Sequence, residues 1–200
     1  IGAYKGTIKM GTFMDMHTSS TKVALAVDLD GTLIAGDLLF EVFFKMIKQA
    51  PWLVLLVPFW LLRGKAFFKQ QVFSRVEPEP DGLNYRDDVV ALLKEERAKG
   101  RQVVLATASA ETHAQAIADH LGIFDAVIGS TAGVNLRADQ KARALCERYG
   151  EAGFDYVGNS ADDIAVFNVA RQGIVVAPDK TARDWATSQN ATIVCDEPSL

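Results

Sequence analysis

The feature that most constrains this fold is an apolar run that ends in acidic residues. Residues 23–30 read VALAVDLD, with β-branched side chains and no alternation of polar and apolar residues. Such a run is typical of a parallel strand that is buried on both faces of a sheet. Parallel strands are joined by crossover connections, usually helices, so further strands should alternate with helices along the chain.

The later sequence has this alternation. Short apolar runs predict strands at residues 102–106, 126–128, 156–157, 173–176 and 192–194. Helical patterns lie between them, at residues 86–99, 111–121, 138–149, 162–171 and 180–189. We therefore predict an α/β fold with a doubly wound, Rossmann-like parallel sheet, whose ligand site lies at the carboxyl ends of the strands. Asp28 and Asp30 would lie at that edge.

Composition excludes several classes of protein. The 200 residues are 49% apolar and 23% charged, far from the composition of a disordered chain. The net charge of −4 argues against a nucleic-acid partner. Cys146 and Cys195 have neither paired spacing nor a disulfide framework, so we expect reduced thiols and a cytoplasmic location.

The segment at residues 38–62 breaks the alternation, with 19 apolar residues in 25. Its longest uncharged stretch, residues 49–62, is shorter than the roughly 20 residues that cross a bilayer, so we expect helices without a membrane span. Basic residues in and around it outnumber acidic ones by six to two: Lys45, Lys48, Arg63, Lys65, Lys69 and Arg75 against Asp37 and Glu41. The segment either packs on itself, or contacts an anionic membrane surface or a phosphate with an apolar tail.

Asp28 and Asp30 form a pair of carboxylates suited to phosphoryl transfer. They lie two residues apart at a strand-to-loop junction, where Gly31 permits a turn that brings both into the crevice. Asp28 would attack phosphorus and form an acyl phosphate. Asp30 would protonate the leaving oxygen and then activate water. The alternative, that the acids merely end a strand, does not account for the whole sequence D-x-D-G-T.

The sequence DLDGTL, which begins at Asp28, resembles the first signature of the haloacid dehalogenase superfamily. That resemblance implies a phosphatase that uses Mg²⁺. The second signature of the superfamily corresponds to VVLATAS. It implies that the Thr107 hydroxyl and the Ala108 amide bind the phosphoryl group together with Gly31. Ser109 is the competing hydroxyl.

Two further signatures extend the resemblance over residues 23–174. NLRADQKARAL supplies Lys141, which by resemblance neutralises the carboxylates and phosphate oxygens. FDYVGNSADDIAVF resembles the acidic loop G-D-S-x-x-D, with Asn159 where the superfamily usually has a metal-binding Asp. The resemblance implies a metal site made of Asp28, the backbone carbonyl of Asp30, Asn159 and Asp163, with Asp162 as another carboxylate within reach.

The stretch between the first two signatures matches in position the helical cap of the phosphoserine-phosphatase-like branch. This divides the chain into a core at residues 22–36 and 85–200, a cap at 37–84 and an extension of native or foreign origin at 1–21. The amino-acid sequence of the cap, together with the segment YVGNSADDIAVF, also resembles the phosphatase-like domain that is fused to UbiA-type prenyltransferases. That resemblance implies a prenyl- or lipid-linked phosphate as substrate and membrane association through the cap.

We therefore predict a magnesium-dependent phosphomonoester hydrolase that forms an aspartyl phosphate and acts on a small phosphorylated molecule or a lipid phosphate. Asp30 argues against a dehalogenase, whereas a phosphomutase stays open. The alternative from another class is a weakly active regulatory or docking domain of a membrane prenyltransferase system, in which Asn159 reflects relaxed metal binding. The physiological substrate and the oligomeric state also stay open.

Overall fold

The fold is built on one parallel sheet, seen in a computed structural model that describes residues 23–131 and 133–195. Its strands are β1 (Ala24–Val27), β2 (Val103–Ala110), β3 (Ala126–Ser130), β4 (Phe154–Gly158), β5 (Gln172–Val176) and β6 (Thr192–Cys195). They lie in the order β3-β2-β1-β4-β5-β6, and every pair of neighbours is parallel. The predicted fold class is therefore confirmed. The strand order reverses between β1 and β4, which is where such sheets bind ligands.

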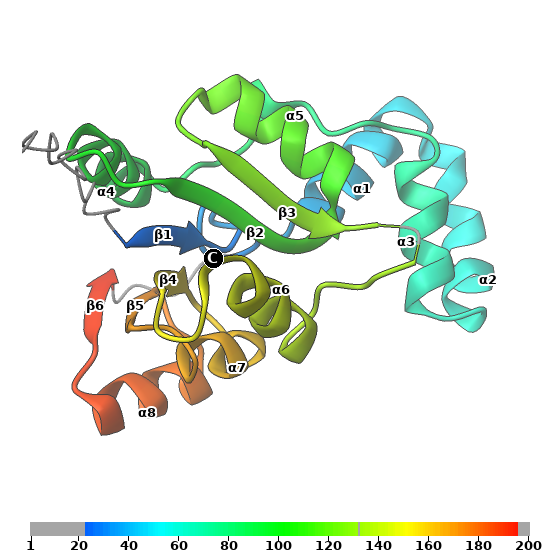
Figure 1. The fold of residues 1–200 in the computed structure, drawn as a ribbon. Coiled ribbons are helices and arrows are strands. Elements are labelled where there is room, and N and C mark those ends of the chain that lie inside the picture. Colours follow the sequence, from blue (N-terminus) through cyan, green and yellow to red (C-terminus); the bar gives the residue numbers. More distant parts are fainter. Residues whose placement is uncertain (1–22, 132, 196–200) are drawn as a thin grey trace, which may run out of the picture.

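Helices cover both faces of the sheet because its strands are apolar on both sides. From β1, Leu25 and Val27 pack with α4 (Asp87–Ala98) and α5 (Glu111–Leu121). The alternate residues, Ala24 and Ala26, pack on the other face with helices α6 (Asp139–Tyr149), α7 (Ile164–Phe167) and α8 (Lys180–Gln189). Figure 1 shows these two layers above and below the strands.

A run of helices in the connection from β1 to β2, before α4, lies beyond the carboxyl ends of these strands (Figure 1). It comprises α1 (Leu38–Gln49), η1 (Pro51–Leu56), α2 (Val57–Leu62) and α3 (Lys65–Phe73), and we call it the helical segment; η2 (Pro80–Gly82) follows. The Asp37 carboxylate caps α1 by accepting from the backbone N of Leu39, at 2.8 Å. Among the described residues, no helix is long and apolar enough to cross a membrane. The helices expected at residues 38–62 are present, and their action as a cap stays a prediction.

Two predicted elements have the wrong extent. The helix expected at residues 162–171 is instead the 3-10 turn η3 (Ala161–Asp163) followed by α7, which ends at Phe167 because the chain must turn back to begin β5. The strand expected to end at residue 106 continues to Ala110, since it pairs with β3 again after an irregular stretch. The predicted extension at residues 1–21 lies outside the described residues.

Candidate active site

A cavity of about 400 Å³ lies at the carboxyl ends of the central strands. The ends of β1 and β2, the loop after β4, and helices α1, α3 and α6 all contribute to its walls. Among the residues expected at the site, it is lined by Asp28, Asp30, Ala108, Ser109, Lys141, Asp162 and Asp163. The topology therefore gathers residues from all four signature segments at one edge of the sheet.

Asp28 and Lys141 form a buried ion pair in this cavity. Asp28 follows β1, and its backbone N donates to the carbonyl of Val157 in β4, at 2.9 Å. Lys141 enters from α6 and donates from Nζ to Asp28 Oδ1 at 2.6 Å. Burial raises the pKa of Asp28 to about 7, against the opposing effect of Lys141. Burial alone would lower the pKa of Lys141, but Asp28 and Asp163 raise it above its ordinary value, so the lysine stays charged.

Asp163 holds this lysine from the other side. Its Oδ1 accepts from Lys141 Nζ at 3.2 Å and from the Tyr156 hydroxyl at 2.6 Å. Its Oδ2 accepts from the backbone N of Asn159 and of Ser160, both at 3.1 Å. Burial would raise the pKa of Asp163, but Lys141 and these hydrogen bonds lower it. Both carboxylate oxygens are thus used within the chain, and Asp163 positions the lysine and the loop after β4.

Tyr156 is a member of this network that the sequence analysis missed. Its buried hydroxyl accepts from Lys141 Nζ at 2.8 Å while donating to Asp163. A tyrosine in a strand that is buried throughout needs a partner for its polar tip, and the apolar context of FDYVG could have indicated this. The identity of the partner could not be read from the sequence, because Lys141 comes from another element.

Asp30 is fixed between two elements. Its Oδ1 accepts from the backbone N of Leu38 at the start of α1, at 2.7 Å. Its Oδ2 accepts from the Ser109 hydroxyl at the end of β2, at 2.9 Å. Burial raises the pKa of Asp30 above its ordinary value, although these hydrogen bonds oppose the shift. A carboxyl group with a raised pKa is suited to carry a proton at neutral pH.

The two candidate hydroxyls differ in position. Thr107 is fully buried and does not line the cavity, and its Oγ1 accepts from the backbone N of Ser109 at 3.0 Å. Ser109 and Ala108 do line the cavity. Thr107 therefore holds the end of β2 in shape, while Ser109 is the hydroxyl that reaches the cavity and Asp30.

Gly31 is required by a close approach of two loops. It has a positive φ of 77°, and a Cβ atom at this position would collide with the side chain of Asn159. Asn159 Oδ1 in turn accepts from the Thr32 hydroxyl at 3.3 Å. Neither Gly31 nor Asn159 is among the residues that line the cavity. They lie together behind it, where the loops after β1 and β4 meet.

Two cations at the cavity were not expected as site residues. Lys69 of α3 lies 3.5 Å from the carbonyl of Ala108, and it also lines a second, wider cavity of about 1200 Å³ between α3 and α5. Arg137 pairs with Asp162, its Nε lying 2.8 Å from Oδ2, and both side chains are largely exposed. The sequence indicates only the charge of Lys69, because this residue lies far from the signatures along the chain.

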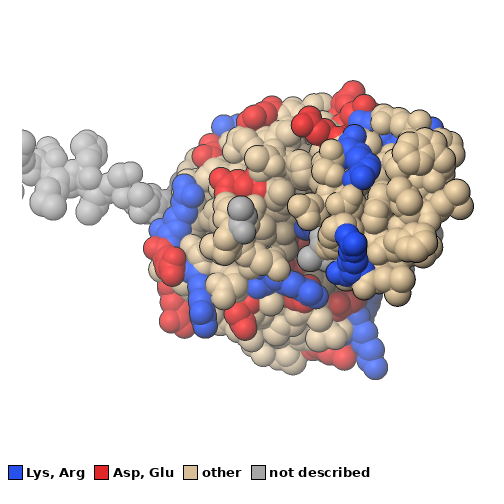
Figure 2. All heavy atoms as spheres, turned by 90° about the vertical axis from the view of Figure 1, so that its right-hand side faces the viewer, with Lys and Arg blue, Asp and Glu red and all other residues tan. Residues whose placement is uncertain are grey.

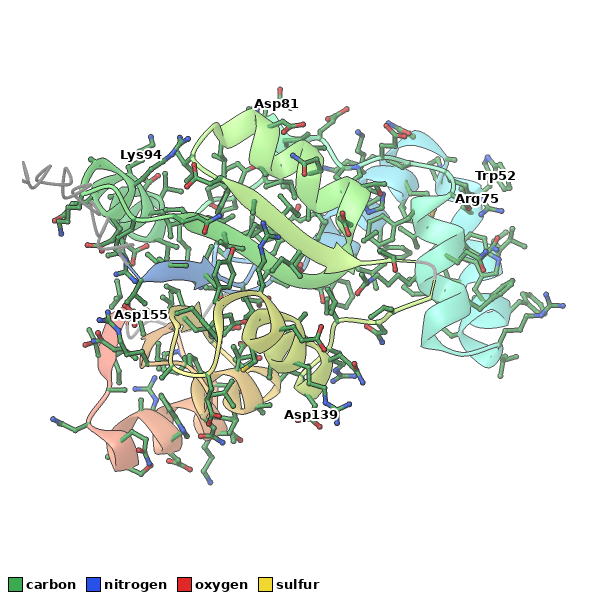
Figure 3. All side chains as sticks on the ribbon, viewed as in Figure 1. Trp52, Arg75, Asp81, Lys94, Asp139 and Asp155 are labelled. Atoms are coloured by element: carbon green, nitrogen blue, oxygen red, sulfur yellow. The ribbon has the colours of Figure 1, made fainter. Side chains whose placement is uncertain are left out.

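A buried acid elsewhere in the sheet has a different environment. Asp155, labelled in Figure 3 far from the helical segment, accepts from both Arg101 and Arg171 at 2.6 Å. Its charge is neutralised by two guanidinium groups, and neither cavity described above is lined by it. Burial of an acid is therefore not sufficient to mark the site; Asp28 differs because it also faces a cavity.

The comparison with protein families agrees with this geometry. The model of the haloacid dehalogenase-like hydrolase family matches residues 25–168. The chain belongs to this family. The prediction of an enzyme of the hydrolase class is thereby confirmed.

Among curated proteins, the chain is similar to the "Uncharacterized protein y4nM" of Sinorhizobium fredii (strain NBRC 101917 / NGR234). The two are 34% identical over 164 residues, which is 82% of this chain and 31% of the relative. The chain thus spans about a third of the length of that relative.

Solved structures share the fold of this hydrolase. A protein with unknown function from Bordetella pertussis Tohama I has a TM-score of 0.64 at 14% identity, covering 86% of this chain and 97% of that one. The HAD family hydrolase t0658 from Salmonella enterica subsp. enterica serovar Typhi has a TM-score of 0.63 at 14% identity, covering 81% and 64%. A phosphoserine phosphatase in apo form has a TM-score of 0.57 at 17% identity, covering 89% and 94%.

The cavity offers few oxygen donors for a Mg²⁺ ion. Among residues 23–131 and 133–195, no three acidic, histidine or cysteine side chains gather where they could share a metal ion. The Asp28 carboxylate lines the cavity, whereas Asn159, which follows β4, does not line it, and its amide oxygen accepts from the Thr32 hydroxyl at 3.3 Å. Mg²⁺ keeps several waters and is often bound through one or two carboxylates, so this donor set is compatible with it.

Proposed function

We propose that the chain is a Mg²⁺-dependent phosphomonoester hydrolase that forms an aspartyl phosphate on Asp28. The observation that carries the proposal is the buried contact of 2.6 Å between Asp28 and Lys141 in a cavity that Asp30 also lines. A carboxylate that is held by one charged lysine and faces a second, separately fixed carboxyl group suits the division into nucleophile and acid.

In the first step, an oxygen of Asp28 attacks phosphorus. A bond forms between this oxygen and phosphorus, and the bond from phosphorus to the leaving oxygen breaks. Asp30 gives its proton to the leaving oxygen, which departs as an alcohol. The raised pKa of Asp30 favours the protonated form that this step requires.

In the second step, water attacks the phosphorus of the aspartyl phosphate. Asp30, now ionised, takes a proton from the water, the new bond to phosphorus forms, and the bond to Asp28 breaks. Inorganic phosphate leaves and both carboxyl groups return to their initial state. Lys141 balances negative charge in both steps, while Asp163 and Tyr156 keep its ammonium group in place.

The metal would be held by Asp28 and Asn159, together with the backbone carbonyl of Asp30. When bound, Mg²⁺ neutralises the charge that develops on the phosphoryl oxygens. We assign the phosphoryl contacts to the Ala108 amide and to Ser109, which line the cavity, with Thr107 as their support.

The substrate that we favour is a phosphate with a large apolar part, such as a prenyl or lipid phosphate. The cavity between α3 and α5 shares Lys69 and Ala108 with the catalytic cavity, and Phe73 contributes an aromatic wall. A phosphate bound at Asp28 could extend its leaving group into this space, with Lys69 at the junction. Residues of the helical segment would then contact the apolar part of the substrate and select it, as expected of a cap.

A second candidate is a weakly active regulatory or docking domain of a membrane prenyltransferase system. The observation in its favour is the reduced donor set, in which Asn159 supplies an amide and Asp163 uses both oxygens within the chain. Such a domain would show little turnover with any phosphate ester, even at high Mg²⁺ concentration.

Hydrolysis of an aryl phosphate separates the two candidates. We expect Mg²⁺-dependent turnover that EDTA removes and that is lost in Asp28→Asn. The matched control is Asp139→Asn, which alters an exposed acid at the start of α6 (Figure 3) and should retain turnover. Turnover in Asp28→Asn equal to that of the unaltered chain would contradict the proposal. A panel of phosphoserine, sugar phosphates and prenyl phosphates, compared by kcat/KM, then tests the substrate class.

A further inference from the structure

The helical segment carries most of the exposed apolar surface of the chain. Among the described residues, twelve large apolar side chains are exposed, and nine of them lie between residues 40 and 62. We call these nine the apolar face: Phe40, Phe44, Trp52, Val54, Leu55, Leu56, Phe59, Leu61 and Leu62. The other three are Val134, Ile193 and Val194.

The apolar face is not a by-product of internal packing. In α1, Val42 and Met46 already fill the inner side and are buried, while Phe40 and Phe44 point outward. Leu62 is 85% exposed, which leaves almost its whole side chain outside the fold. The expectation that the segment simply packs on itself is thus met only on its inner side. Contiguous apolar surface of this kind marks an interaction site.

Positive charge borders the apolar face. Lys48, Arg63 and Arg75 are exposed, and Glu41 is the only acidic residue between positions 38 and 75. The guanidinium groups of Arg63 and Arg75 lie over the rings of Phe67 and Trp60, at 5.1 and 4.9 Å. Figure 2 shows a largely tan surface on the right with several blue side chains, and some red ones at the top, along its edge, and Figure 3 shows Trp52 and Arg75 at the same end of the molecule.

We propose that the apolar face docks on an anionic membrane surface. Short helices with bulky apolar side chains and cations at their border are suited to lie in the plane of a membrane, with aromatic and leucine side chains among the acyl chains and cations at the headgroups. The border is positive although the whole chain carries −4, so the complementary partner is negatively charged. The proposal concerns a contact in the plane of one leaflet, made by the short helices of the segment.

A second copy of the chain is a poorer partner for this face. A symmetric dimer places the same patch of both copies in contact. Both copies would then bring an excess of cations to the interface, because Glu41 is the only acid of the segment and Glu79 beyond it already pairs with Lys45. Anionic headgroups meet the same cations without repulsion.

Docking would hold the catalytic cavity close to the membrane. Leu39 of α1 and Lys69 of α3 line the cavity, and the same helices carry or support the apolar face. The membrane proposal goes beyond the proposed hydrolase activity and does not depend on it, because binding to vesicles requires no turnover.

The proposal is tested by co-sedimentation of the 200-residue chain with vesicles of phosphatidylserine and phosphatidylcholine, and with phosphatidylcholine alone. We expect binding to the anionic vesicles that weakens with added salt. Val54 and Val134 provide a matched pair, since both are 49% exposed and only Val54 belongs to the apolar face. Val54→Asp should lower vesicle affinity at least about tenfold, while Val134→Asp should leave it unchanged.

Charge is tested by a second matched pair. Lys48→Gln should lower the affinity for anionic vesicles about fivefold and leave any affinity for phosphatidylcholine unchanged. Lys94→Gln is the control, because Lys94 is exposed on α4 at the far end from Trp52 (Figure 3). Circular dichroism and aryl-phosphate turnover in solution show whether each variant is folded.

Three results would overturn the proposal. The first is absence of the unaltered chain from sedimented anionic vesicles. The second is equal vesicle binding by Val54→Asp and Val134→Asp. The third is a dimer in sedimentation equilibrium that Val54→Asp dissociates, which would assign the face to a second copy. None of these results depends on whether Asp28 forms an acyl phosphate, so failure here is distinct from failure of the proposed activity.

Discussion

The catalytic edge of the sheet and the apolar face of the helical segment depart from ordinary packing in opposite ways. At the edge, Asp28, Lys141 and Asp163 are charged groups in the interior, and hydrogen bonds within the chain satisfy them. On the apolar face, Trp52 and Leu62 are large apolar groups at the surface, and no described residue covers them. The charged groups at the edge are satisfied within the described residues, whereas the apolar face leaves large side chains that these residues do not cover.

This contrast predicts that removing one member of the catalytic network is strongly destabilising. Lys141→Met would leave Asp28, Asp163 and Tyr156 facing one another without a cation, and we expect the free energy of unfolding to fall by about 3–5 kcal/mol. Urea denaturation measures the change. Lys94→Met, on the exposed side of α4, is the control and should shift it by no more than about 0.5 kcal/mol. An equal change in the free energy of unfolding for the two variants would show that the buried network contributes no more to stability than an exposed lysine.

Asp30→Asn separates chemistry from packing at the same edge. An amide keeps an oxygen to accept from the backbone N of Leu38, but it cannot carry the proton that the leaving oxygen needs. We expect aryl-phosphate turnover to fall about 10²–10⁴-fold, with the unfolding transition nearly unchanged. Unaltered turnover would remove Asp30 from the mechanism.

Two tyrosine variants allow a comparison between a buried hydroxyl that has hydrogen-bond partners and one that has none among the described residues. Tyr156→Phe removes the group that bridges Lys141 and Asp163, and should lower the free energy of unfolding by about 1–3 kcal/mol. The Tyr149 hydroxyl is buried without a hydrogen-bond partner among the described residues, so Tyr149→Phe should be neutral or stabilising. Thermal and urea unfolding of both variants measure these changes in the free energy of unfolding. A greater loss in Tyr149→Phe would refute the proposed importance of the network.

Asn159→Asp tests the metal assignment. The carboxylate adds a negative charge at the proposed metal site with nearly the reach of the amide, so the Mg²⁺ concentration for half-maximal activity should fall several-fold. The titration uses aryl-phosphate hydrolysis by the two proteins at equal concentration. An unchanged or higher Mg²⁺ requirement would mean that residue 159 does not lie at the metal.

The smallest effect is expected on the apolar face. Leu62→Ala removes a side chain that is 85% exposed, and should change the free energy of unfolding by no more than about 0.5 kcal/mol. Leu93→Ala, on the buried side of α4, should lower it by about 2–5 kcal/mol. Similar losses for the two leucines would show that the apolar face is part of the core.

The fold was predictable where sequence pattern and burial agree. The apolar runs gave the parallel strands, and the periodic segments at 111–121 and 180–189 have the same bounds as α5 and α8. The helix expected at 162–171 was too long, because the return of the chain to β5 ends α7 at Phe167 whatever the helical pattern. Local pattern predicts an element, while its end depends on the next connection.

The site was predictable only in part, because spacing along a strand does not fix which side chains meet. Asp28, Asp30 and Lys141 were expected and do converge, since the ends of parallel strands share one edge. The choice between Thr107 and Ser109 depends on the irregular end of β2, which spacing alone cannot give. Lys69 and Tyr156 were missed because their roles depend on contacts between elements far apart in sequence.

The most direct measurement is to trap the covalent intermediate. The chain is mixed with Mg²⁺ and an aryl phosphate, quenched in acid, and reduced with borohydride, which converts an aspartyl phosphate into homoserine for peptide mass spectrometry. We predict the modification at position 28 alone in the unaltered chain, and none in Asp28→Asn. Turnover without modification at position 28, or modification at another acid, would contradict the account.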